Sequence, residues 1–214
     1  VYHSLVKNSF SANVFDACIL DIEKGYRKGV EIPSNLYSMK KIIHQLRLIK
    51  NEDEISLIRK ACDISANAHK KLMRICKANI SEKALESNLI YNFGLNNATE
   101  AYTSIVASGK NACILHYINN SSLLNNGDLL LTDAACEFQN YASDITRTIP
   151  INGKFTSNQK LIYNLVLKAQ TKAIEKCIVG NTLRDVHMAA VRILSRGLID
   201  IGLLKKDYKT VLKK

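Results

Sequence analysis

The fold is decided by the stretch Leu129-Leu130-Leu131-Thr132-Asp133-Ala134-Ala135-Cys136 and the run that follows it, Tyr141-Ala142-Ser143-Asp144-Ile145-Thr146-Arg147-Thr148-Ile149. Both runs are apolar or β-branched for most of their length, which is typical of β-strands. Only residues 137–140 separate them, so they are close enough in the chain to form a tight hairpin. The sequence therefore predicts two neighbouring antiparallel strands.

Each strand of this hairpin carries one aspartate. If Phe138 and Gln139 form the centre of the turn, Asp133 and Asp144 face each other across the strands, with Cβ atoms about 4.5–5.5 Å apart. Two like charges in this position repel, and two divalent metal ions between them would remove the repulsion. The alternative from spacing alone is that the turn lies elsewhere and one aspartate faces solvent.

Two further strands are expected upstream, at Tyr102–Val106 and Cys113–Tyr117. Together with the hairpin they should form one antiparallel sheet of four strands. His116 would then lie at the end of a strand, just before a polar loop. From the sequence alone, His116 is either a hydrogen-bonded structural residue or a catalytic one.

Helix patterns surround the strands. A short helix is expected over residues 12–27, a long one from Asn51 to about residue 76, and another from Ser81 to Gly94. After the strands, a capping box at residues 156–159 opens a fourth helix, and a fifth spans about residues 182–199. This order predicts an α+β fold in which helices cover one face of an antiparallel sheet.

Composition narrows the class of protein. The chain has 214 residues, 47% hydrophobic and 23% charged, which is typical of a globular domain. No apolar run reaches the roughly 18 residues of a spanning helix, and residues 1–10 do not resemble a signal peptide. Because the six cysteines are scattered without a metal-binding or redox spacing, we expect free thiols in a soluble, cytoplasmic protein with no membrane partner.

The net charge of +11 raises the question of a nucleic-acid partner. The basic residues are 22 lysines and 8 arginines, spread along the whole chain rather than gathered in a patch. A surface that binds nucleic acid more often concentrates arginine and interleaves exposed aromatic residues. We therefore do not expect nucleic acid as a partner.

Several motifs resemble those of aminopeptidase P (Xaa-Pro aminopeptidase), a family of dinuclear metallopeptidases with the pita-bread fold. They are Ile114-Leu115-His116-Tyr117, Gly127-Asp128-Leu129-Leu130-Leu131-Thr132-Asp133-Ala134, Tyr141-Ala142-Ser143-Asp144-Ile145-Thr146-Arg147-Thr148 and Asn152-Gly153-Lys154-Phe155-Thr156. The resemblance extends from the first residues to the last. It implies that residues 1–50 are the end of an N-terminal domain with its linker, and that residues 51–214 are the N-terminal half of a pita-bread domain.

The resemblance also implies a function. In this family two divalent ions, usually Mn²⁺, activate a water that attacks the peptide bond between the first residue and a following proline. By motif, Asp133 and Asp144 would be metal ligands, and His116 would be a catalytic residue that binds substrate or the transition state. The family's other ligands, a histidine and two glutamates, belong to the second half of its domain, beyond Lys214.

Three hypotheses follow from this resemblance. The chain is part of an Xaa-Pro aminopeptidase that acts on peptides with proline in second position, and a complementary C-terminal half or a homo-oligomer completes it. Alternatively, it is a non-catalytic pita-bread binding module for an acidic partner. The third hypothesis is a decayed fragment. Retention of Asp133, Asp144 and His116 favours the first over the second, because a binding module has no need of two repelling carboxylates.

Overall fold

The computed structural model describes residues 2–3, 10–31, 35, 37–205 and 208. Parts of both predicted segments therefore lie outside the described residues, namely residues 1, 4–9, 32–34 and 36 of the first and residues 206–207 and 209–214 of the second. The chain divides into two compact units, residues 1–59 and residues 60–214. Each unit is described by itself.

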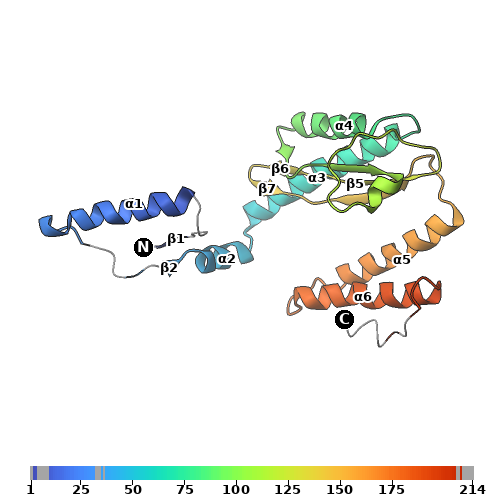
Figure 1. Cartoon of the computed structure of the whole chain (residues 1–214). Coiled ribbons are helices and arrows are strands. Elements are labelled where there is room, and N and C mark those ends of the chain that lie inside the picture. Colours follow the sequence, from blue (N-terminus) through green and yellow to red (C-terminus); the bar gives the residue numbers. More distant parts are fainter. Residues whose placement is uncertain (1, 4–9, 32–34, 36, 206–207, 209–214) are drawn as a thin grey trace. The chain divides into compact units, whose positions relative to one another are not determined.

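The first unit is small and mostly helical (Figure 1). The helix expected at residues 12–27 is confirmed as α1, Phe10–Lys24, which is followed by the 3₁₀ helix η1, Tyr26–Lys28. Two short strands, β1 (Tyr2–His3) and β2 (Tyr37–Ser38), pair in parallel, and α2 spans Lys40–Leu48. The exposed apolar side chains Leu46, Leu48 and Ile49 lie in the last turn of α2 and just after it, before the next helix.

The two helices that precede the strands begin at the predicted capping residues. In α3, Glu52–Ile75, the side chain of Asn51 accepts a bond from the Glu54 amide while Glu54 accepts one from the Asn51 amide. In α4, Glu82–Gly94, the Ser81 hydroxyl accepts a bond from the Ala84 amide at 3.1 Å. These side chains satisfy backbone donors that a helix start leaves unpaired.

The strands of the second unit form two antiparallel sheets of three strands each. One sheet has the order β3-β6-β7 and the other β4-β5-β8. Their bounds are β3 Thr99–Glu100, β4 Ile105–Ser108, β5 Leu129–Asp133, β6 Cys136–Phe138, β7 Tyr141–Ala142 and β8 Thr146–Pro150. The α+β class with antiparallel pairing is confirmed, whereas the single sheet of four strands is wrong.

The expected strand at Cys113–Tyr117 is also wrong. Gly109 has a φ of +53°, and the chain leaves β4 there to form the 3₁₀ helix η2, Gly109–Cys113. Residues 114–117 then form a turn rather than a strand. The apolar run Ile114-Leu115 resembled a strand, but both side chains are exposed, so no sheet pairing or burial holds the segment extended.

A long hairpin passes through both sheets, because β5 continues into β6 and β7 returns into β8. At the interruption between the sheets, the hydroxyl of Ser65 on α3 accepts a bond from the Cys136 amide at 2.9 Å and pairs with the Ser143 hydroxyl at 2.8 Å. The Ser65 side chain thus pairs with a backbone amide that has no strand partner where the two sheets separate. Buried backbone groups need such a hydrogen-bond partner.

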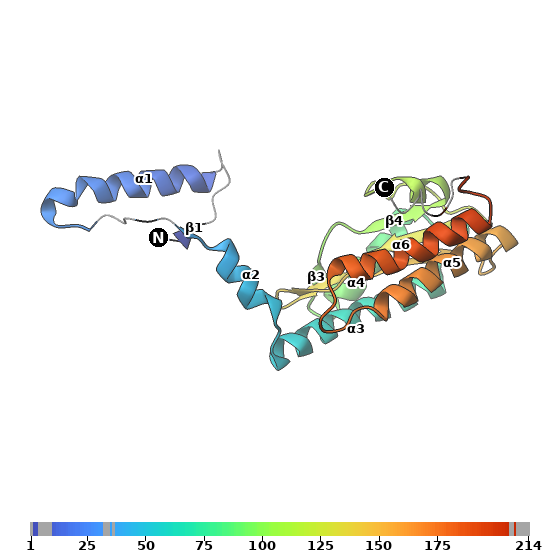
Figure 2. The ribbon, with the colours of Figure 1, turned by 90° about the horizontal axis from the view of Figure 1, so that it is seen from below.

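The hydrophobic core lies between α3, α4 and the strands, which are adjacent in Figures 1 and 2. Its largest fully buried members come from these elements and from the loop before β5: Leu72, Leu85, Leu89, Phe93, Val106, Leu124 and Leu130. Along β5, side chains alternate between buried and half-buried, so Leu130 and Thr132 face the core while Leu131 and Asp133 face the other side. This alternation places the aspartate on the open face of the sheet.

The last two helices, α5 (Ser157–Ile174) and α6 (Leu183–Asp200), lie side by side and run in opposite directions (Figure 2). Each begins with a capping box, Thr156 with Gln159 and Thr182 with Asp185, as predicted for the first of them. Gly197 allows their close approach, since a Cβ there would lie 2.2 Å from a methyl carbon of Leu165. No helix among the described residues is long and apolar enough to cross a membrane.

Candidate active site

The turn of the hairpin lies one residue later than the sequence analysis placed it. Phe138 pairs with Tyr141, so Gln139 and Asn140 form the two-residue turn, and their φ angles of +49° and +68° lie in the left-handed region. Two-residue hairpin turns favour this geometry, and asparagine tolerates it well. Asp133 therefore pairs with Thr146 across the strands, and the predicted direct pairing with Asp144 is wrong.

A tyrosine nevertheless brings the two aspartates together. The hydroxyl of Tyr102 donates to Oδ1 of Asp133 at 2.7 Å and to Oδ1 of Asp144 at 3.0 Å. Because a phenol has one proton, the two carboxylates share a single donor. Thr146 is the cross-strand partner of Asp133, and Asp144 lies two positions before Thr146. Side chains in such a diagonal relation can still approach each other.

Tyr102 is held in its neutral form. Burial raises the pKa of its hydroxyl, and the two neighbouring carboxylates raise it further. The sequence predicts only a strand position for Tyr102, but it lies just before β4, where its hydroxyl reaches both aspartates. No local sequence signal marks it, because its partners are 31 and 42 positions away.

His116 lies in the turn that follows η2, with a φ of +55° and an exposed side chain. It lines a pocket of about 300 Å³ together with Asp133, Thr146 and Leu131. The structure thus places His116 and Asp133 around the same cavity, although His116 does not end a strand. Asp144 is not among the residues that line this pocket and is linked to it through Tyr102.

A second histidine lies under the sheet. His69 on α3 is buried, and its Nε2 is 2.8 Å from the carbonyl oxygen of Ala134, the residue after Asp133. Burial lowers the pKa of His69, which favours the neutral ring. Among the described residues, two buried polar atoms have no hydrogen-bond partner: Nδ1 of His69 and the hydroxyl oxygen of Thr132 on β5. No role is predicted for His69 from the sequence.

A buried glutamate supports the turn that carries His116. Glu82 is 0% exposed and stands at the first position of α4. Its carboxylate accepts five hydrogen bonds, from the amide and hydroxyl of Ser108, the side chains of Asn111 and Tyr117, and the amide of Ser122. Burial raises the pKa of Glu82, but these donors lower it by more, so the net shift is downward.

The donor atoms at the aspartate pair suit a hard divalent cation, because carboxylate oxygens are the ligands that Mg²⁺, Mn²⁺ and Ca²⁺ prefer. The pair provides two carboxylates that converge on one hydroxyl rather than on a cationic side chain. Among the described residues, no group of three or more histidine, cysteine, aspartate or glutamate side chains could hold a metal ion. The aspartates thus fit part of a metal site and leave coordination positions to be filled.

Comparison with known proteins gives a consistent result. The model of Metallopeptidase family M24 matches residues 56–212. The chain is 45% identical over 181 residues to the Xaa-Pro aminopeptidase of Haemophilus influenzae, which covers 84% of this chain and 42% of that protein. The chain therefore spans less than half the length of this curated relative.

Solved structures agree. The aminopeptidase PepP of Pseudomonas aeruginosa matches with a TM-score of 0.94 and 39% identity, over 100% of this chain and 48% of that one. A zinc-substituted aminopeptidase P of Escherichia coli in complex with product matches with a TM-score of 0.93 and 35% identity, over 100% and 49%. The structure is consistent with part of a pita-bread domain, and the chain belongs to metallopeptidase family M24.

Proposed function

We propose that this chain is the N-terminal half of the catalytic domain of a metal-dependent Xaa-Pro aminopeptidase, which releases an N-terminal residue that precedes proline. The observation that carries the proposal is the pair Asp133 and Asp144, held on one hydroxyl, together with the pocket that Asp133 and His116 both line. Similarity to Xaa-Pro aminopeptidases supports the substrate class. In this proposal residues 51–214 form the half domain and residues 1–50 end the preceding domain.

Each residue has a defined part in the proposed reaction. Asp133 and Asp144 would contribute ligands to two divalent ions, proposed to be Mn²⁺, which when bound would lower the pKa of a water and polarise the scissile carbonyl. Tyr102 fixes the orientation of both carboxylates. His116 donates a hydrogen bond to the negative charge that develops on the substrate's carbonyl oxygen. The pocket beside His116, with Ile105 and Leu131 in its wall, receives the substrate chain.

The remaining metal ligands must come from elsewhere, because two carboxylates leave most coordination positions of two ions to water. A complementary C-terminal half supplies them in this proposal, either in the same polypeptide or as a second one. Exposed apolar side chains on α5, including Leu161 and Val166, support such a partner. The six free cysteines support a reducing, cytoplasmic location.

The test is hydrolysis of a fluorogenic Xaa-Pro peptide with added Mn²⁺, by the 214-residue chain alone and mixed with the missing half of a relative. We expect turnover only in the mixture. Asp144→Asn should lower kcat by about 100-fold or more, because a neutral amide is a poor ligand for a hard cation.

Asp63→Asn is the matched control, since it removes an exposed carboxylate of α3 and should leave turnover unchanged. An inactive mixture in which both parts are folded would contradict the proposal. Metal-independent affinity for an acidic macromolecule would then point to a binding module, and its absence to a decayed fragment.

A further inference from the structure

Glu82 is the most fully hydrogen-bonded side chain of the described structure that the proposed reaction does not use. Its Oε1 accepts bonds from the Ser108 amide at 2.7 Å, the Ser108 hydroxyl at 2.8 Å and the Asn111 side chain at 3.0 Å. Its Oε2 accepts bonds from the Tyr117 hydroxyl at 2.8 Å and the Ser122 amide at 2.9 Å. All of these donors flank or belong to the segment that carries His116.

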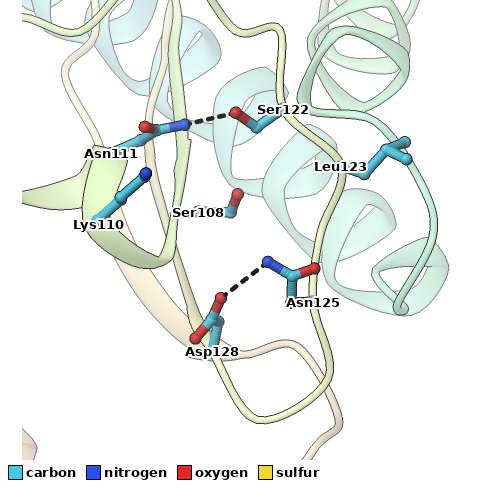
Figure 3. Close-up of a pocket in the computed structure, with 7 residues that line it drawn as sticks. All are labelled: Ser108, Lys110, Asn111, Ser122, Leu123, Asn125 and Asp128. Atoms are coloured by element: carbon cyan, nitrogen blue, oxygen red, sulfur yellow. Dashed lines mark hydrogen bonds between the residues drawn. The ribbon is translucent and has the colours of Figure 1, made fainter.

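The same segment is held to Glu82 by further bonds. The backbone amide of Glu82 donates to the Ser122 carbonyl at 2.9 Å, so backbone and side chain of Glu82 clamp Ser122 from both directions. The Asn111 side chain also donates to the Ser122 hydroxyl at 2.9 Å (Figure 3). The beginning and the end of the loop, residues 108–122, are thus fixed on one carboxylate.

His116 needs such support. Its φ of +55° lies in the left-handed region, which costs a non-glycine residue of this kind of order 1 kcal/mol. Its own side chain is exposed, whereas Tyr117, the next residue, is 8% exposed and hydrogen-bonded to Glu82. The buried, hydrogen-bonded Tyr117 restrains the backbone next to His116.

We propose that Glu82 is a positioning residue, whose buried carboxylate fixes η2 and the turn that follows it, residues 109–117, and so presents His116 to the pocket beside Asp133. The reaction that His116 serves rests on the proposed function, but the geometric effect of Glu82 does not. Among the described residues, no cation pairs with Glu82, and the donors alone stabilise its charge. A neutral amide cannot replace it, because its NH₂ group would face the Ser108 amide in one orientation and the Ser122 amide in the other.

The test uses the 214-residue chain with ¹⁵N-labelled histidine and the variants Glu82→Gln and Glu86→Gln. Glu86 is the matched control because it is also buried, lies one turn further on α4, and bonds only to Lys83 rather than to the loop. The ring resonances of His116, identified by their loss in His116→Gln, report the order of the turn. Amide exchange at Ser108 and Ser122 reports the two anchors.

We expect Glu82→Gln to split or broaden the His116 resonances and to speed exchange at Ser108 and Ser122 about tenfold or more, with the helix content retained. Glu86→Gln should change neither. If Glu82→Gln leaves the His116 resonances and both exchange rates as in the wild type, the proposal is wrong.

A second variant covers the case in which Glu82→Gln does not fold. Tyr117→Phe removes one of the five bonds to Glu82, together with the bonds that the Tyr117 hydroxyl accepts from Asn111 and Ser121. It should still broaden or shift the His116 resonances in a folded chain. Unchanged resonances in Tyr117→Phe would overturn the proposal.

Turnover in the reconstituted enzyme adds a readout of function. There Glu82→Gln should lower kcat about tenfold or more with KM changed much less, because a displaced His116 weakens contacts made in the transition state. A wild-type mixture without turnover would contradict the proposed function, while the resonance experiment would still decide the role of Glu82.

Discussion

Glu82 and Tyr102 show how single side chains in the described part of the chain stabilise negative charge without an ion pair. Glu82 places one carboxylate among five donors, whereas Tyr102 places one donor between two carboxylates. The first arrangement satisfies an anion fully. The second leaves most of the carboxylate oxygens' capacity free, and this difference separates a structural anchor from a site that can accept a ligand.

Glu82 should make the free energy of unfolding depend on pH in the acidic range. Its pKa is lower in the folded chain than in the unfolded one, so its contribution is complete above the unfolded-state value of about 4.3 and is lost as the pH falls through the lower, folded-state value. We expect wild type to exceed Glu82→Gln in unfolding free energy by about 2–4 kcal/mol at pH 7. The difference should shrink below about pH 4.

Urea denaturation at a series of pH values measures this difference. Glu86→Gln is the control, and it should lose less at pH 7 because the Lys83 partner of Glu86 is well exposed and the pair is weakened by solvent. A difference between wild type and Glu82→Gln that stays constant from neutral to acidic pH would contradict the prediction.

Asp133, Asp144 and His116 could be proposed as site residues from the sequence, whereas the residues that organise them in the structure could not. The two aspartates were placed near each other because a hairpin restricts which residues can meet, even though the turn was misplaced. The roles of Tyr102 and Glu82 could not be predicted, because each residue contacts partners at least 26 positions away in the chain. Neither a repeat nor a local motif encodes such contacts.

Elements with local signals were predicted best. The helices α3 to α6 begin at capping residues that the sequence displays, since a cap and its partner lie three positions apart. The Cys113–Tyr117 segment failed for the opposite reason. Its β-rich composition was overridden by Gly109 and by the attachment of Tyr117 to Glu82, which bend the chain into a turn.

The α5–α6 pair depends on the absence of a side chain at Gly197. A Cβ there would meet three atoms of Leu165 at 2.2–3.0 Å, so the whole leucine side chain must move. We expect Gly197→Ala to destabilise the pair by about 1–3 kcal/mol, because overpacking outweighs the gain in helix propensity of up to about 1 kcal/mol.

Amide exchange along α5 and α6 measures this change, which should be largest around Leu165. Gly94→Ala at the end of α4 is the matched control, since a Cβ there meets nothing within 4 Å and should be neutral or slightly stabilising. Equal protection in both variants would show that the helices tolerate a wider separation.

At the scale of the whole molecule, a run of exposed apolar side chains extends along α5 and into the start of α6. On α5, Ile162 and Val166 lie four residues apart on one face and are 36% and 52% exposed. Further exposed apolar side chains follow at Leu161, Leu167, Ile174, Ile178, Val179 and Leu183. Such a surface normally contacts a partner.

We expect the isolated chain to self-associate, and the variant Ile162→Glu with Val166→Glu to weaken that association about tenfold or more. Sedimentation velocity over a range of concentrations measures the effect. Leu20→Glu is the control, because Leu20 is 57% exposed on α1 and its change should leave the association as it is. A wild-type chain that stays monomeric at its highest soluble concentration would contradict the prediction.

The anchoring of residues 108–122 by Glu82 also bears on the order in which the chain folds. The contacts of Glu82 span 26 to 40 positions, whereas the Ser65–Ser143 bond that joins α3 to the hairpin spans 78. Closing the shorter loops costs less entropy. During synthesis the turn that presents His116 can therefore form as soon as Ser122 has left the ribosome, before either aspartate proposed to bind metal has emerged from it.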